Sequence, residues 1–129
     1  MNKGYKIEEI DIIVKAIKEC VMKDCFYVYN RPKNIAFRES FNLDKSKIKE
    51  LLMTLETKDF CFSDKSDNVK HNDVDLYVFG MRRNLLDFTA IEKNIEIYTK
   101  IDIVGLGDKK SIATISLHEA DFDMIYLFE

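Results

Sequence analysis

Three side chains with complementary acid–base properties stand near the end of the chain. Tyr98 and Lys100 are two residues apart in an alternating segment, and His118 lies in the next such segment. A spacing of two places both side chains on the same face of a β-strand. If the chain reverses at residues 105–108, His118 can lie across the sheet from them, which would bring a phenol, an ammonium group and an imidazole together.

This set of groups is suited to cutting RNA without a metal ion. The reaction needs a base that takes the proton of the ribose 2′-hydroxyl and an acid that protonates the leaving 5′-oxygen. It also needs a cation beside the phosphate. Histidine titrates nearest neutral pH, so His118 suits the acid or base role. Lys100 suits the phosphate, and Tyr98 can position or donate.

Ordinary structural roles explain the same three residues. A strand histidine can be a surface or hydrogen-bonded residue, since unusual titratable groups mark sites only in a probabilistic way. A lysine can keep an exposed sheet face soluble, and tyrosine is a common strand residue. The spacing by itself leaves the catalytic and the structural interpretations open.

A second candidate site is the segment Arg-Pro-Lys-Asn at residues 31–34. Arginine and lysine beside a rigid turn can hold phosphates. The alternative is a helix entry, which needs no more than the proline and a capping residue. Arg31 and Lys33, together with Arg82 and Arg83, are the candidate RNA-binding residues.

The elements that must position these side chains follow from the hydrophobic pattern. Alternation with a period of two predicts strands at residues 74–81, 95–104 and 111–118, with a glycine-rich turn at residues 105–108. In the last strand, Ile112, Thr114, Ser116 and His118 are expected on one face. Consecutive hairpins of this kind predict an antiparallel sheet.

The first half of the chain has helical spacing instead. The pattern predicts helices at residues 7–22 and 45–56, a short helix through Phe37 and Phe41, and a short strand at residues 60–62. Residues 25–29 are either a short strand or an extended link. Asp44 is a suitable N-cap for the second long helix. We therefore expect one α+β domain over residues 1–129, with an antiparallel β-sheet packed against N-terminal helices.

The predicted core joins the two halves. It consists of Ile10, Ile13, Val14, Ile17, Leu51, Leu52, Leu55, Ile97, Ile101 and Ile115. The only histidine besides His118 is His71, which is expected in a polar loop.

Composition limits the classes of function. The 129 residues are 47% hydrophobic and 33% charged, which is typical of a globular domain. There is no signal-peptide pattern and no apolar run that could span a membrane, so a cytoplasmic location is expected. The three cysteines lack a CxxC spacing and only two histidines are present, so we expect reduced thiols, no metal and no cofactor. The net charge of −3 argues weakly against broad electrostatic binding of nucleic acid.

Several short motifs, taken in order, resemble the MqsR-type toxins of bacterial type II toxin–antitoxin systems. They are Arg31-Pro32-Lys33-Asn34, Phe41-Asn42-Leu43, Ile48 to Leu55 with Asp59-Phe60, Leu76-Tyr77-Val78-Phe79-Gly80, Ile97-Tyr98-Thr99-Lys100-Ile101, Ser116-Leu117-His118-Glu119, and the tail Ala120 to Phe128. The resemblance covers roughly residues 5 to 128.

The resemblance implies a RelE-like ribonuclease fold and an endoribonuclease that a protein antitoxin neutralises. It places the family's strand tyrosine at Tyr98 and its neighbouring lysine at Lys100. His118 stands where the best-known members have a lysine, and Tyr77-Val78 replaces a Trp-Gln pair. The expected partners are RNA, a cognate antitoxin and the ribosome. The alternative is a catalytically silent relative that binds protein or nucleic acid in a defence or mobile-element setting.

Overall fold

The computed structural model describes residues 4–65, 75–105 and 107–129. Within them, three α-helices lie in the first half of the chain and the four longest strands follow, which confirms the predicted α+β class. The elements are α1 (Ile7–Met22), β1 (Phe26–Val28), α2 (Pro32–Ser40), α3 (Lys45–Met53), η1 (Thr57–Asp59), β2 (Phe60–Lys65), β3 (Asp75–Leu86), β4 (Glu92–Val104), η3 (Gly107–Lys109) and β5 (Ser111–Glu119). His71 lies outside the described residues.

The strands form one sheet in the order β1-β5-β4-β3-β2. The pairs from β5 to β2 are antiparallel, as the alternating pattern predicts. One edge differs from the prediction, because β1 pairs with β5 in parallel and sets Phe26 opposite Ile112. Parallel neighbours need a long connection between them, and here all the other elements after β1 supply it. No local pattern in the sequence predicts the pairing of two strands so far apart in the chain.

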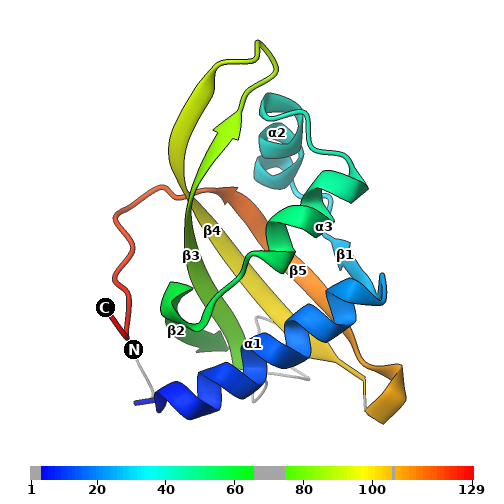
Figure 1. Cartoon of the computed structure of the whole chain (residues 1–129), viewed down its shortest axis with the longest axis vertical. Helices are drawn as coiled ribbons and strands as arrows, with labels where there is room; N and C mark the ends of the chain where they lie inside the picture. Colours follow the sequence, from blue (N-terminus) through cyan, green and yellow to red (C-terminus); the bar gives the residue numbers. More distant parts are fainter. Residues whose placement is uncertain (1–3, 66–74, 106) are drawn as a thin grey trace.

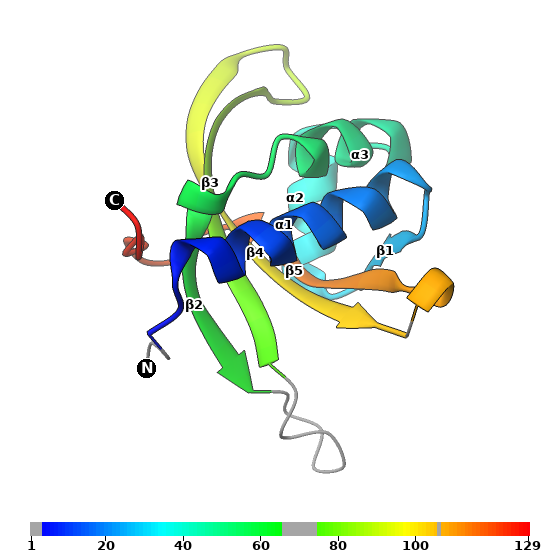
Figure 2. The same ribbon diagram turned by 60° about the horizontal axis from the view of Figure 1, so that its bottom comes forward.

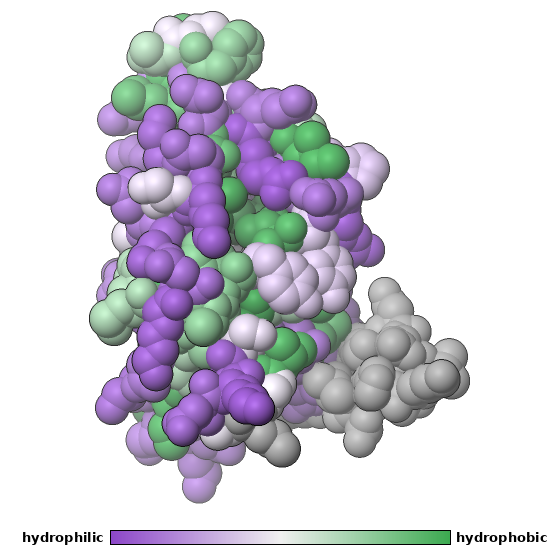
Figure 3. Space-filling view, turned by 90° about the vertical axis from the view of Figure 1, so that its right-hand side faces the viewer, coloured by the Kyte–Doolittle hydropathy of each residue, from purple (hydrophilic) through white to green (hydrophobic). Residues whose placement is uncertain are grey.

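The sheet has two different faces. We call the face that the helices cover the inner face and the opposite face the outer face. Figures 1 and 2 show α1 and α3 across the inner face, with the C-terminal segment, drawn in red, on the other side of the sheet. Tyr126 of that segment packs with Val78 and Cys61 in a small outer cluster. The side of the molecule that β1 borders carries hydrophilic side chains with hydrophobic ones between them (Figure 3).

The inner-face core confirms most of the predicted core. Eight of the ten predicted residues are buried there. Ile13 is half-buried and packs against the core from its edge. Ile115 was expected in the core, but it is partly exposed and stands outside it. The reason is a bulge in β5, at which Ile101 pairs with Thr114 while Lys100 pairs with Ser116, so that Ile115 has no partner across the ladder.

The helix boundaries agree closely with the hydrophobic pattern. Helix α1 spans the predicted residues, and Asp44 caps α3 by accepting a hydrogen bond from the Lys47 amide at 2.9 Å. Helix α3 ends at Met53, three residues before the predicted end, because Glu56 adopts an extended backbone and starts the short helix η1.

Strands β3 and β4 are longer than predicted and form an extended hairpin. Polar residues pair across its outer part, for example Asn84 with Asn94, and these polar pairs hide the alternation on which the sequence prediction depends.

Candidate active site

Tyr98 and His118 face each other across adjacent strands on the outer face. They are direct partners in the β4–β5 ladder, and their rings stack with centroids 5.4 Å apart and planes 14° from parallel. Lys100 lies two residues further along β4, and its Nζ atom is 6.0 Å from the centre of the Tyr98 ring. The structure therefore brings together the three side chains that the sequence singles out.

The bulge at Ile115 decides which face His118 occupies. Before the bulge, Ile112 and Thr114 pair with inner-face residues of β4, whereas Ser116 and His118 pair with the outer-face residues Lys100 and Tyr98. The four residues expected on one face are thus divided between the two faces. Uninterrupted alternation from Ile112 would have turned His118 toward the core.

Asn34 of α2 holds the bulged part of β5 in place. Its side-chain amide donates to the carbonyls of Tyr29 and Ile115, both at 3.0 Å, and its carbonyl oxygen accepts from the Leu117 amide at 2.9 Å. Asn34 is fully buried, so these bonds satisfy backbone groups of β5 beyond the end of β1. The motif at residues 31–34 therefore serves to position the strand that carries His118.

Tyr98 lies in a half-buried setting that keeps its hydroxyl protonated. Burial raises the pKa of the Tyr98 phenol, and the nearby Lys100 ammonium group opposes part of that rise. Phe122 packs edge-on against the Tyr98 ring with centroids 5.9 Å apart. At neutral pH this side chain can donate a hydrogen bond or a proton but cannot act as a base.

Lys100 is mostly buried by its neighbours and has a carboxylate beside it. Its Nζ atom lies 3.4 Å from Oδ2 of Asp64, and the two side chains are 16% and 52% exposed. Because the Asp64 carboxylate is half-exposed, solvent weakens its attraction for the ammonium group, and another anion that approaches this face can compete for Lys100.

The imidazole of His118 has one nitrogen committed to the backbone. Its Nδ1 atom is 2.9 Å from the carbonyl oxygen of Glu119. A carbonyl oxygen only accepts hydrogen bonds, so Nδ1 carries the proton in the neutral ring and Nε2 has the lone pair. The hydrogen bond thus assigns Nε2 as the atom that can take a proton.

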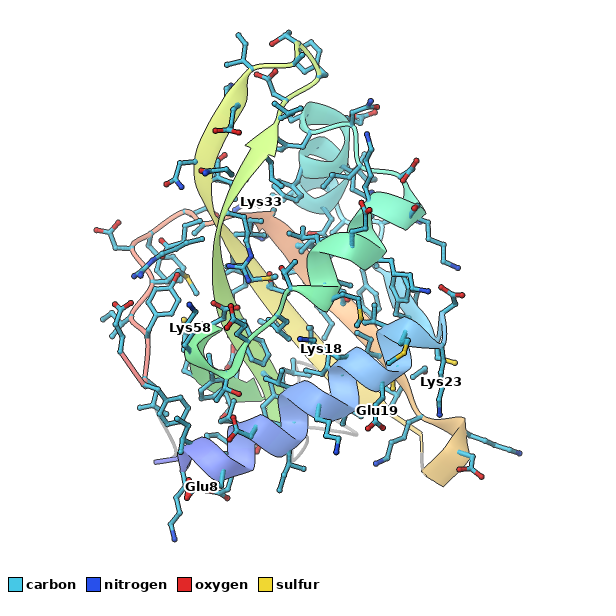
Figure 4. The ribbon with its side chains drawn as sticks, viewed as in Figure 1. Glu8, Lys18, Glu19, Lys23, Lys33 and Lys58 are labelled. Atoms are coloured by element: carbon cyan, nitrogen blue, oxygen red, sulfur yellow. The ribbon has the colours of Figure 1, made fainter. Side chains whose placement is uncertain are left out.

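Of the predicted RNA-binding residues, Arg31 and Lys33 lie at the start of α2. Arg31 occupies the N-cap position and is exposed. Lys33, which is labelled in Figure 4, forms an ion pair with Asp121 just after the end of β5. This contact holds the pKa of the Asp121 carboxyl below its usual value. Lys33 and His118 also line the same hollow. Lys33 is therefore close to the candidate catalytic group.

Arg82 and Arg83 are adjacent in β3 and point to opposite faces. Arg82 lies on the outer face, where it pairs with Glu96 and Glu129 and stacks on Tyr126 with its guanidinium carbon 4.0 Å from the ring centre. Arg83 lies on the inner side and donates to Thr54 and Asp59. The structure does not bring these two arginines together, and both have carboxylate partners. Their contacts hold the C-terminal segment and the end of α3 to the sheet.

Sequence reasoning missed three residues at the site: Asn34 as the clamp on β5, Asp64 as the partner of Lys100, and Phe122 as the wall beside Tyr98. A buried asparagine in a helix has no pattern that distinguishes it from a surface one. Asp64 reaches the site from β2, which β3 separates from β4, and Phe122 reaches it from the tail, so no spacing along the chain connects them with Tyr98. The aromatic residues of the tail were the one feature of the sequence that could have indicated the contact of Phe122 with Tyr98.

No group of three histidine, cysteine, aspartate or glutamate side chains is arranged to hold a metal ion among the described residues. Cys20, Cys25 and Cys61 are free thiols. In the same part of the chain no helix is long and apolar enough to cross a membrane. The chain matches no family model, no curated protein and no solved structure.

Proposed function

We propose that this chain is a cytoplasmic, metal-independent endoribonuclease of the MqsR type, a toxin that cuts RNA with His118, Tyr98 and Lys100. The observation that carries the proposal is the stack of Tyr98 on His118 beside the Lys100 ammonium group. A base, a proton donor and a cation thus lie together on the outer face of the sheet. All three belong to the sequence motifs that resemble MqsR-type toxins.

In the proposed reaction, Nε2 of His118 takes the proton of a ribose 2′-hydroxyl. The 2′-oxygen then attacks the adjacent phosphorus, and the bond from phosphorus to the 5′-oxygen breaks. The protonated Tyr98 phenol donates its proton to the leaving 5′-oxygen, and Lys100 stabilises the negative charge on the phosphoryl oxygens. The products are a 2′,3′-cyclic phosphate and a 5′-hydroxyl, and solvent returns the proton from His118 to Tyr98.

The first experiment measures cleavage of RNA by purified variants, with and without ribosomes. His118→Ala and Lys100→Ala should each lower the rate by about 10²- to 10⁴-fold, the usual effect of losing such a group. Lys109→Ala is the matched control, because it removes an exposed lysine at the far end of the same hairpin and should leave the rate unchanged. Tyr98→Phe removes the proton donor but keeps the ring that stacks on His118, so it should lower the rate, though less than Tyr98→Ala, which removes both.

The substrate tests the chemistry independently of the variants. A 2′-deoxy nucleotide at the cleaved position should block the reaction, and the products should carry 2′,3′-cyclic phosphates. Activity should also survive a chelator. The proposal fails if the purified protein cuts no RNA under either condition and its expression does not arrest growth.

A second candidate function is binding without catalysis. The observation that favours it is that each candidate catalytic group already has a partner: Lys100 lies 3.4 Å from Asp64, and His118 is stacked on Tyr98. Such a module would bind RNA or protein through the same face. A binding module would bind RNA without cutting it, whereas a nuclease would cut the RNA that it binds.

The proposal includes a protein antitoxin as partner. Its support, besides the resemblance, is that Phe122 and Ile125 are 55% and 84% exposed on the tail, so a protein that covered them would also cover Tyr98. Co-expression with the cognate antitoxin should restore growth. Ile125→Asp should weaken that rescue while cleavage by the purified protein continues.

A further inference from the structure

A hollow of about 360 Å³ opens beside His118, on the side of the ring toward α2. Three segments distant in sequence form it: helix α2, the tip of the β3–β4 hairpin, and the end of β5 with the start of the tail. Besides His118, its lining includes Lys33, Asp87, Phe88, Lys93, Glu119 and Asp121. Its volume lies at the lower end of the range for small-ligand pockets, about 300–1,000 Å³. It can therefore hold one flat group the size of a nucleobase.

Phe88 is the unusual residue of this hollow, because an aromatic ring at the tip of a hairpin is 73% exposed. Hydrogen bonds close the turn that carries it. The Asp87 carboxylate accepts hydrogen bonds from the Thr89 amide and hydroxyl and from the Ile91 amide, at 2.8, 2.6 and 3.0 Å. The Phe88 amide itself donates to the carbonyl of Ser40 in α2 at 2.8 Å. The ring is thus held next to the hollow by a rigid backbone.

The charges of the lining disfavour a phosphate as the occupant. Lys33 is paired with Asp121, and Lys93 is paired with Asp87 at 3.2 Å. Glu119 adds a further carboxylate. Two ammonium groups against three carboxylates give no excess of positive charge for an anion. The same groups supply hydrogen-bond donors and acceptors of the kind that recognise the edge of a base.

We propose that this hollow binds a nucleobase of single-stranded RNA, with Phe88 stacking on the base and the polar groups of the lining contacting its edge. The inference rests on the proposed function. It deepens that function by assigning the base on the 5′ side of the cleaved bond, whose ribose carries the 2′-hydroxyl that His118 deprotonates. The hollow then selects which nucleotide places its 2′-hydroxyl at the site.

The test measures binding without cleavage. A panel of short 2′-O-methyl oligonucleotides, in which the attacking hydroxyl is blocked, is titrated against the full chain by fluorescence anisotropy. Loss of one stacked base weakens binding by about 5- to 150-fold, so Phe88→Ala should lose affinity within that range. Phe88→Trp keeps an aromatic surface and should retain affinity. Ile91→Ala is the matched control, because Ile91 is 58% exposed on the same turn but does not line the hollow.

A second readout is the base preference at the cleaved position. Phe88→Ala should reduce the discrimination among the four bases on the 5′ side of the bond, while Ile91→Ala should leave it unchanged. The protein could bind oligonucleotides in a way that depends on Phe88 and yet cut no RNA. That result would support the base site and contradict the proposed nuclease. Cleavage and binding by Phe88→Ala at wild-type levels would overturn the base site alone.

Discussion

Gly80→Ala tests the packing of the C-terminal segment on the outer face. A Cβ atom at residue 80 would lie 2.5 Å from the hydroxyl oxygen of Tyr126 and 2.9 Å from the ring carbon that bears it. Comfortable contacts begin near 3.5 Å, so the ring must move by about 1 Å. The movement disturbs the hydrogen bond from Tyr126 to Glu96, which is 2.5 Å long.

The expected cost combines two opposing effects. Overpacking a well-filled site destabilises by about 1–3 kcal/mol. Alanine in place of a strand glycine lowers the entropy of the unfolded chain and returns about 0.5–1 kcal/mol. The net loss in the free energy of unfolding should therefore lie between about 0 and 2.5 kcal/mol. In a Tyr126→Ala background the clash is absent, so Gly80→Ala should become neutral or stabilising.

Urea denaturation of the four proteins in this double-mutant cycle measures the coupling between the two positions directly. Tyr126→Phe supplies an intermediate case, since it removes the nearest atom but keeps the ring carbon at 2.9 Å. The cost of Gly80→Ala should fall in the order Tyr, Phe, Ala at residue 126. An equal cost in all three backgrounds would refute the packing of Tyr126 on Gly80.

Three further predictions concern the core, the hairpin turn and the thiols. Leu52 is fully buried, so Leu52→Ala should lower the free energy of unfolding by about 2–5 kcal/mol in urea denaturation, and a loss well below that range would contradict its burial. Hydrogen bonds from Thr89 and the Ile91 amide lower the pKa of Asp87, so its contribution to stability is present above the ordinary aspartate pKa of about 3.9 and is lost as the pH falls below it. The difference in Tm between wild type and Asp87→Asn should therefore shrink from pH 7 to pH 3, and a constant difference would count against this turn. Burial raises the pKa of the Cys61 thiol to about 12, so iodoacetamide at pH 8 should label the partly exposed Cys25 well before Cys61. Peptide mass spectrometry follows the labelling, and equal labelling of the two thiols would be inconsistent with the fold.

Local pattern predicted the elements and most of the inner core. The helical spacing of Ile10, Val14 and Ile17 gave α1 its correct limits, because one buried stripe requires residues three and four apart. The alternation around Ile97 and Ile101 gave β4, because successive strand side chains point to opposite faces.

Pairing between distant segments was beyond any local pattern. The parallel position of β1 and the long polar hairpin depend on which backbone groups are available after the other strands have paired. The motif at residues 31–34 shows the same limit. Its asparagine proved to be a buried clamp on β5, and nothing in four residues of sequence identifies the strand that it holds.

For the candidate site, the sequence determined which side chains share a face of β4, because the two-residue spacing of Tyr98 and Lys100 is a property of any strand. It could not determine that His118 belongs to the same face. That outcome depends on one unpaired residue, Ile115, which reverses the alternation halfway along β5. A bulge arises where the ladder, the neighbouring helix and the tail best satisfy their hydrogen bonds and packing together, and that balance exists only in the folded chain.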